Sequence, residues 1–370
     1  MAMGYRLVPR FAGRPLRLPW STIPVLVLLC AGLTLRTVAQ PLLDLPGMRA
    51  LLLAGALAEA AAAVLFCAAV IATLAPGSGG FAPAPLLMLG ALGFAAQATL
   101  GLVLLAMIPT GDLALPAARD RALLSVQFSA FLLPFVLGVA SRALPSFFKY
   151  RAAEPRLTWA IAGALGAGAA LQATAARPLA AVVAARLEAA GGLLVATGAL
   201  GGAALTGVWR PPERLRTSAR DSALLLRTAF AWLAVAALWL GVISTPALLT
   251  GRPAPAAHID GIRHTLALGV VTTLILGMGQ LVLPWLAMRR PRRGGGGRAN
   301  GRALWALLLV ATALRVAGAL LEGRAAPEVR YGMMGLAGLL GFIAVAWFAT
   351  SILRAARVRP PEIPLHLRPE

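Results

Sequence analysis

The sequence predicts an all-α, polytopic membrane protein, a helical bundle of about ten transmembrane helices. Of its 370 residues, 59% are hydrophobic and only 13% are charged, and the mean hydropathy is +0.81. A soluble globular domain does not reach these values. The hydrophobic residues also form long runs, each able to cross a bilayer as a helix of roughly 20 residues. The lipid bilayer is therefore the first expected partner.

The runs place the expected helices in order along the chain. We expect spans near residues 22–39, 47–75, 84–108, 121–144, 157–174, 178–208, 223–249, 262–287, 302–321 and 331–354. The basic N-terminal stretch is not followed by a short apolar segment with a cleavage site, so the first run is expected to remain as an uncleaved anchor.

The formal net charge of +21 lies mostly in the connections between apolar runs, which indicates membrane topology and not a nucleic-acid partner. Basic residues fill every second connection: Arg6, Arg10, Arg14 and Arg17; Lys149, Arg151 and Arg156; Arg210, Arg214, Arg216 and Arg220; Arg289, Arg290, Arg292, Arg293, Arg298 and Arg302; Arg354, Arg357, Arg359 and Arg368. The opposite set carries the acids Asp44, Asp112, Asp260, Glu322 and Glu328. We expect a bacterial inner (plasma) membrane protein with both termini in the cytoplasm.

Two segments of the chain share one frame, which predicts an internal repeat. When 264–284 is laid on 125–145, Gly277 falls on Gly138 and the sequence LGMGQLVLP matches LGVASRALP. The neighbouring spans align roughly at the same offset, so spans three to six repeat as spans seven to ten. Because four spans is an even number, the two four-helix repeats are expected to run parallel through the membrane. The expected divisions are 1–80, with two helices, 81–220 and 221–370.

His264 opens the eighth expected span beside Arg263 and Asp260, and it is the one histidine expected within a span. A neutral imidazole there could ligate a haem iron or another metal, or relay protons. The alternative is an interfacial histidine that is hydrogen-bonded to a loop. Arg315 lies in the ninth span, roughly 10 Å below the outer surface at 1.5 Å per residue. It needs an anionic partner such as a haem propionate, a substrate carboxylate or Glu188, or else its side chain extends outward to the headgroups.

Other polar residues of the apolar runs are weaker candidates. Arg186 and Glu188 face away from each other on a helix, so each would need a partner on another helix; the favoured alternative is that 189–209 spans alone and leaves both in water. Glu59, near the middle of the second span, is a candidate proton or cation site or a neutral, hydrogen-bonded acid. Gln127 could bridge helices, and Ser125 takes the place of His264 in the first repeat.

Several function classes lack their residues in this sequence. The three histidines are His258, His264 and His366, and the two cysteines have no metal-ligand or disulfide spacing. A copper site with three histidines and a bis-histidine haem cannot both be built from one embedded imidazole. The sequence has no Walker loop, nucleophile elbow or zinc signature. No catalytic residue is assigned.

The segment HTLALGVVTTLILGMG resembles the NnrS family, haem- and copper-containing bacterial membrane proteins of the nitric oxide response that are distantly similar to haem-copper oxidase catalytic subunits. The family cadence is matched by His264, Gly269, Thr272, Thr273, Gly277 and Met278, and its leucine-arginine pair by Leu314 and Arg315. FVLGVASRALPSFF is similar to an earlier family segment, through Arg142, Pro145 and Phe147. The resemblance covers spans seven to nine well and spans four to ten loosely. The chain departs from the family in having no histidine before His258, so copper is not expected.

The resemblance implies a haem site in which His264 is the iron ligand and Arg315, with the neighbouring Arg263, neutralises the cofactor's acidic groups. The first hypothesis is therefore a haem-binding, NnrS-like protein that binds or senses in nitric oxide or respiratory stress without turnover. The second is a transporter or channel for a small solute or ion, with Glu59 and Arg315 along its path. The third is a cofactor-free assembly partner of a membrane complex.

Overall fold

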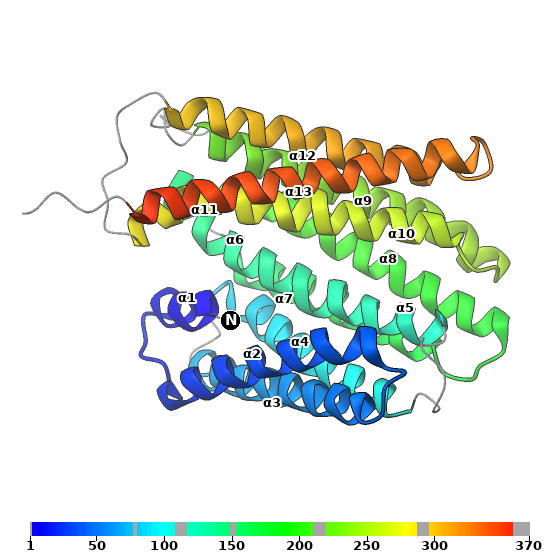
Figure 1. Ribbon diagram of the computed structural model, residues 1–370, viewed down its shortest axis with the longest axis horizontal. Coiled ribbons are helices and arrows are strands. Elements are labelled where there is room, and N and C mark those ends of the chain that lie inside the picture. The colour runs from blue at the N-terminus through cyan, green and yellow to red at the C-terminus, as the bar shows by residue number, and fades with distance from the viewer. Residues whose placement is uncertain are drawn as a thin grey trace, which may run out of the picture. The chain divides into compact units, whose positions relative to one another are not determined.

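The computed structural model describes residues 2–76, 80–107, 117–148, 153–209, 220–286 and 296–357, and all regular structure in them is helical (Figure 1). The helices are α1 (Ala2–Ala12), α2 (Thr22–Ala39), α3 (Met48–Leu74), α4 (Ala84–Ala106), α5 (Ala117–Ser125), α6 (Leu133–Phe148), α7 (Pro155–Ala175), α8 (Ala181–Leu205), α9 (Arg220–Thr250), α10 (Ala256–His264), α11 (Thr273–Leu286), α12 (Gly296–Leu320) and α13 (Pro327–Arg357). Two π-helical segments, η4 (Val126–Leu132) and η6 (Thr265–Thr272), join α5 to α6 and α10 to α11. The all-α class is confirmed.

Within the described residues, nine helical segments are long and apolar enough to cross a membrane. They include the continuous stretches Ala117–Phe148 and Ala256–Gln280, each of which contains a π-helical segment. The expected span at 157–174 forms α7, a helix of 21 residues, but α7 is not among the nine. Its sequence is dominated by Ala and Gly, which are less apolar than Leu or Ile. The nine long apolar segments confirm the multi-pass membrane architecture.

The chain forms two compact units, and α9 passes from one to the other. Unit 1 consists of Met1–Pro212 and Ala234–Pro255, and unit 2 of Glu213–Leu233 and Ala256–Glu370. The sequence-based boundaries at residues 80 and 220 remain predictions.

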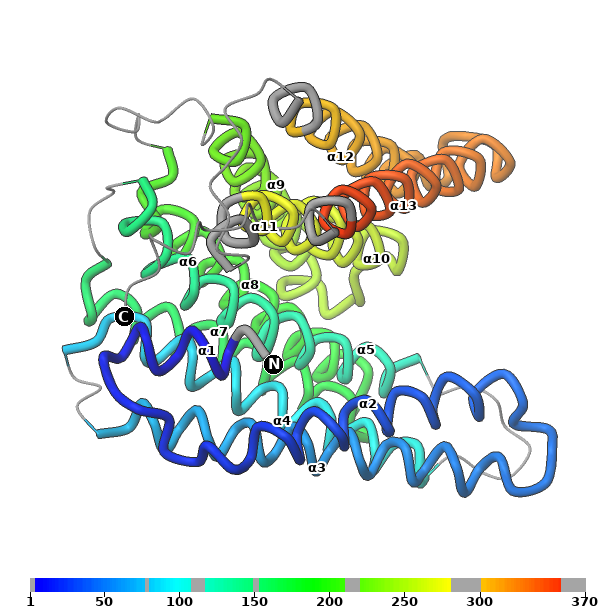
Figure 2. Tube along the Cα trace, turned by 60° about the vertical axis from the view of Figure 1, so that its left-hand side comes forward, coloured from blue at the N-terminus to red at the C-terminus, as the bar shows by residue number. Residues whose placement is uncertain are grey.

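In unit 1 each helix packs against its neighbour in the chain: α2 on α3, α3 on α4, α4 on η4 and α6, and α7 on α8. The α2–α3 hairpin is visible in both views of the chain (Figures 1 and 2). Glycines set the closest approach between α7 and α8. A Cβ atom on Gly168 would lie 2.7 Å from the carbonyl oxygen of Gly191, so larger residues would separate these helices.

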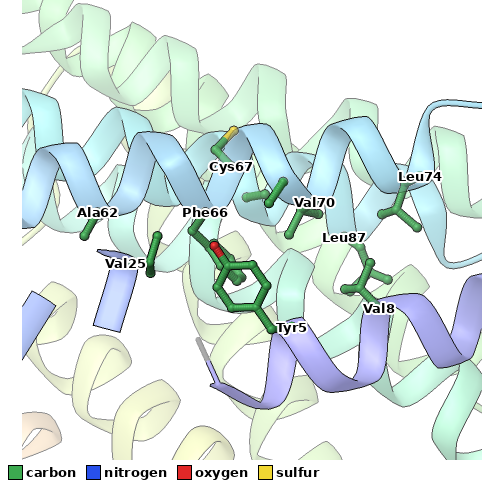
Figure 3. Packing of buried hydrophobic residues seen from close by; sticks show 11 residues of the cluster. Tyr5, Val8, Val25, Ala62, Phe66, Cys67, Val70, Leu74 and Leu87 are labelled. Atoms are coloured by element: carbon green, nitrogen blue, oxygen red, sulfur yellow. The ribbon is translucent and has the colours of Figure 1, made fainter. Parts of the chain in front are cut away.

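Helix α1 precedes the first span and was not expected from the sequence. Its Tyr5 and Val8 are buried against α3, where the ring of Tyr5 meets Phe66 edge to face at a centroid distance of 5.3 Å (Figure 3). The Tyr5 hydroxyl lies 2.9 Å from Ser21 Oγ. Burial raises the pKa of Tyr5 above its ordinary value, and the hydrogen bond with Ser21 opposes this in part. The basic N-terminus is therefore a packed helix of unit 1.

Unit 2 is built around α12, which packs on α10, η6 and α13. The α12–α13 pair lies side by side in Figures 1 and 2. Trp305 on α12 donates a hydrogen bond from Nε1 to Thr228 Oγ1 on α9 at 2.8 Å. On α9, Trp232 also contacts the π-helical segment, because a Cβ on Gly269 would lie 2.9 Å from its ring.

The two units repeat the same local geometry at the offset that lays Gly277 on Gly138. Ser125 precedes η4 as His264 precedes η6, so both π-helical segments begin at equivalent positions. Gly138 packs against Leu87 of α4, and Gly277 packs against Leu225 and the equivalent Leu226 of α9. The helix pairs also correspond, since α5 packs on α7 and α7 on α8 in unit 1 as α10 packs on α12 and α12 on α13 in unit 2. These shared contacts support the predicted repeat.

Much of the charge used to predict topology lies outside the described residues. This applies to Asp112, Lys149, Arg151, Arg210, Arg214, Arg216, Arg289, Arg290, Arg292, Arg293, Arg359, Arg368 and the histidine His366.

Candidate functional site

The predicted site residues His264 and Arg315 lie together in unit 2. His264 is the last residue of α10, and Asp260 stands one turn earlier on the same face, as expected for residues i and i+4. Arg315 comes from α12, which packs on α10. We refer to Asp260, His264 and Arg315 as the α10–α12 cluster.

Each member of the α10–α12 cluster contacts the other two. Arg315 Nη2 donates to Asp260 Oδ2 at 2.7 Å and lies 3.1 Å and 3.2 Å from Nδ1 and Nε2 of His264. His264 Nδ1 lies 2.9 Å from the backbone oxygen of Asp260 and 3.2 Å from its Oδ1. We assign the imidazole proton to Nδ1, since this atom faces two acceptors. Nε2 then carries the lone pair and accepts from Arg315.

The three side chains differ in exposure, and the positive charge of Arg315 is the most buried of them. The Arg315 side chain is 16% exposed, whereas Asp260 and His264 are 46% and 45% exposed. Arg315 Nε is buried and has no hydrogen-bond partner in the described part of the chain. A buried N–H donor without an acceptor is costly. The guanidinium is therefore neutralised at one end by Asp260 and unsatisfied at Nε.

The π-helical segment η6 fixes the position of the cluster. The hydroxyls of Thr272 and Thr273 donate to carbonyls five residues earlier, at 2.9 Å and 3.1 Å, and so cover oxygens of the wider turn. A Cβ on Gly269 would lie 2.8 Å from Thr312 Cγ2 on α12. Thr312 precedes Arg315 by almost one turn. This close contact sets the register between α12 and the helix that carries His264. π-Helical turns are frequently found at functional sites.

Asp260 is the anionic partner that Arg315 was predicted to need. From the sequence, Asp260 is expected only as an acid of the connection that precedes the eighth span. Asp260 could have been recognised from its i,i+4 spacing to His264. Arg263, one residue before His264, lies about 100° around the helix from it and is half-buried.

Glu59 is not isolated: Arg36 on α2 donates from Nη1 to Glu59 Oε2 at 3.2 Å. The side chain of Glu59 is 16% exposed, and its Oε1 is buried without a hydrogen-bond partner among the residues described. A Cβ on Gly32 would lie 2.8 Å from Glu59 Cγ, so the glycine permits this placement. Arg36 is not expected from the sequence as a partner of Glu59, because it stands near the end of the first span, where an arginine usually reaches the headgroups.

Arg186 and Glu188 both lie within α8, which begins at Ala181 and ends at Leu205. The helix therefore continues past both charges, and the favoured view that 189–209 spans alone and leaves them in water stays a prediction. Glu188 Oε1 lies 4.0 Å from Arg121 Nε on α5, which agrees with the expectation of a partner on another helix. Gln127 is half-buried in η4, and the Ser125 hydroxyl donates to the Arg121 carbonyl at 2.8 Å.

The residues present would supply one nitrogen ligand for a haem iron and one cation for a carboxylate of the cofactor. His264 has one feature of metal-binding histidines, because one ring nitrogen is held by a carbonyl and a carboxylate, while the other accepts from Arg315. Arg315 Nε, without a partner among the described residues, could donate to an anionic group. Among the described residues, no group of three or more His, Cys, Asp or Glu side chains could hold a metal ion.

Neither a protein-family model nor a curated protein matches this chain. The resemblance to the NnrS family stays a prediction from the sequence.

Proposed function

We propose that the chain is an NnrS-like, multi-pass membrane protein that binds haem through His264 and acts in the response to nitric oxide or respiratory stress by binding or sensing. The observation that carries the proposal is the fixed imidazole: Nδ1 lies 2.9 Å from the Asp260 carbonyl, so Nε2, now 3.2 Å from Arg315 Nη2, is the nitrogen that would bind a metal. A haem held by one histidine supplies an open iron position for a diatomic gas.

Arg315 has two roles in this proposal. Its Nη2 lies 3.2 Å from Nε2 of His264, so it would have to move aside for a metal to reach that nitrogen. Its Nε, which has no hydrogen-bond partner among the residues described, would donate to an acidic group of the cofactor.

The test is the visible absorption spectrum of the detergent-purified protein, as isolated and after addition of haemin. We expect a Soret band in the wild type that is lost in His264→Ala and kept in His258→Ala. His258 is the matched control because it lies on the same helix, α10. A colourless wild type that takes up no porphyrin, or a Soret band that persists in His264→Ala, would refute the proposal. Addition of nitric oxide should shift the band of the wild type.

A second candidate function, transport of a small solute or ion, is favoured by the Arg36–Glu59 pair. A charged pair in an apolar span is expensive and often marks a solute pathway, and Glu59 Oε1 has no hydrogen-bond donor among the residues described. In proteoliposomes a transporter should lose flux when Glu59 is changed to Gln, independently of His264. Loss of the Soret band in His264→Ala, together with unchanged flux in Glu59→Gln, would favour the haem proposal.

We also propose a bacterial inner membrane location with both termini in the cytoplasm. The support is the placement of the basic residues in alternate connections. A fluorescent protein fused at the C-terminus should be bright, whereas a periplasmic alkaline phosphatase fusion there should be inactive. The reverse result would invert the topology.

A further inference from the structure

Helix α1 has a basic face on the side away from its packing contacts. Tyr5 and Val8 are buried against α3 (Figure 3), whereas Arg6 and Arg10 are exposed. At about 100° per residue, the two arginines lie one turn apart, on the side of the helix away from Tyr5 and Val8. Two further exposed arginines follow in the connection to α2. We refer to the four together as the N-terminal basic patch: Arg6, Arg10, Arg14 and Arg17.

The N-terminal basic patch has no anionic partner in the described part of the chain. None of its guanidinium groups forms an ion pair or a hydrogen bond with another described residue. The sequence gives the reason, because residues 1–43 contain no Asp or Glu. In contrast, Arg36 and Arg315 each lie beside a carboxylate. The positive charge of the patch is therefore uncompensated within the described residues.

The N-terminal basic patch lies where two spans of unit 1 end. The backbone N–H of Arg17 donates to Thr73 Oγ1 at 3.2 Å, and Thr73 is in the last turn of α3. The apolar span that contains α2 starts at Pro19, just after Arg17. Trp20, at the start of this span, is exposed, which is typical of aromatic residues at the level of the lipid headgroups. The patch is therefore at the boundary between the apolar layer and water, which long arginine side chains readily reach.

We propose that the N-terminal basic patch is a binding site for an anionic phospholipid of the bilayer. The guanidinium groups of Arg6 and Arg10 donate to the phosphate oxygens of the headgroup, since the donors of arginine match two such oxygens at once. The acyl chains lie along the apolar span that starts at Pro19, a contact that a free phosphate ion cannot make. A zwitterionic phospholipid carries its own cation and compensates the patch less. Because Tyr5 and Val8 hold α1 on α3, the lipid is bound at a fixed place on unit 1.

The experiment is a titration of phosphatidylglycerol, labelled with a fluorophore on one acyl chain, with the full-length chain in an uncharged detergent. Fluorescence anisotropy reports binding, and unlabelled compounds compete. We expect phosphatidylglycerol to displace the probe at least tenfold better than phosphatidylcholine, and inorganic phosphate to displace it poorly. Added salt should weaken binding, because it screens exposed charges. Equal displacement by the two lipids would overturn the proposal, and so would displacement by inorganic phosphate as effective as that by phosphatidylglycerol.

Variants assign the binding to the N-terminal basic patch. The double variant Arg6→Gln, Arg10→Gln should bind phosphatidylglycerol about 25-fold more weakly, about fivefold for each arginine. Changing both arginines to Lys keeps the charge and should retain most of the binding, which shows that the loss is not a folding defect.

The matched control is the double variant Arg177→Gln, Arg324→Gln, which removes the same net charge from two exposed arginines of other connections. It should leave the binding unchanged. His264→Ala should not alter the binding either, so this result is independent of the haem proposal. Undiminished binding in Arg6→Gln, Arg10→Gln, or an equal loss in the control, would refute the proposal.

Discussion

Removal of either charge of the Asp260–Arg315 pair should have unequal effects on stability. In Asp260→Asn the guanidinium, which is 16% exposed, remains charged with a weakened partner. In Arg315→Gln the carboxylate, which is 46% exposed, can be hydrated instead. Breaking a fully buried pair costs about 3–5 kcal/mol, and exposed pairs contribute about 1 kcal/mol or less. The intermediate burial here leads us to expect a loss of about 2 kcal/mol for Asp260→Asn and about 1 kcal/mol for Arg315→Gln.

The assay is reversible unfolding in mixed micelles with a rising fraction of denaturing detergent, applied to the wild type, both single variants and the double variant. The double variant should be more stable than the sum of the single effects predicts, with a coupling energy of about 1–2 kcal/mol. Glu322→Gln is the control, because Glu322 lies 3.9 Å from Arg330 and is 43% exposed; we expect about 0.5 kcal/mol or less. Additive single effects, or a greater loss in Arg315→Gln than in Asp260→Asn, would refute this reasoning.

Two further predictions concern packing and the N-terminal helix. Gly138→Ala should destabilise the protein by about 1–3 kcal/mol, because the added Cβ would lie 3.1 Å from the backbone nitrogen of Leu87. Gly332→Ala is the control, since a Cβ there would meet nothing within 4 Å, and it should leave the stability unchanged. Equal midpoints of detergent unfolding for the two variants would contradict the Gly138–Leu87 contact. Tyr5→Phe should cost about 1 kcal/mol, the value of the hydrogen bond with Ser21. Because the folded pKa of Tyr5 is raised, its stabilising effect is complete below the ordinary value of about 10 and is lost as pH rises through the folded pKa. Unfolding measured from neutral to alkaline pH should therefore show a smaller alkaline loss in Tyr5→Phe, and identical pH profiles would exclude this role.

The sequence predicted the membrane helices well because apolar run length is a local property. It also named His264 and Arg315 as members of one site, through a family resemblance and not through spacing. Two features could not be read this way. Helix α1 contains Pro9 and two arginines, Arg6 and Arg10, so its composition is that of a loop, and only the burial of Tyr5 and Val8 against α3 accounts for its packing. In the π-helical segments the backbone hydrogen bonds join residues five apart and not four apart. A continuous apolar sequence contains no pattern that distinguishes the two kinds of turn.

The two units show which contacts a repeated fold retains and which it changes. The Gly138–Leu87 contact has a looser counterpart at Gly277, where an added Cβ would lie 3.1 Å from Leu225 Cβ and 3.6 Å from Cγ of the equivalent Leu226. Gly93 meets the backbone of Ala130 in unit 1, and at the same offset Trp232 meets Gly269 in unit 2. The glycine lies on the first helix of the pair in unit 1 and on the second helix in unit 2, so both units have a close contact here although a different helix supplies the glycine.

Polar residues obey a weaker constraint, because any partner of suitable charge can satisfy them. In unit 2 the anion stands on α10 and the cation on α12, as Asp260 and Arg315. In unit 1 the cation stands on α5 and the anion on α8, as Arg121 and Glu188. Arg121 and Asp260 hold equivalent positions, but their partners do not, because α12 corresponds to α7 and not to α8. Equivalent backbone positions in the two units therefore carry charges of opposite sign, and each charge is neutralised from a different helix of its own unit.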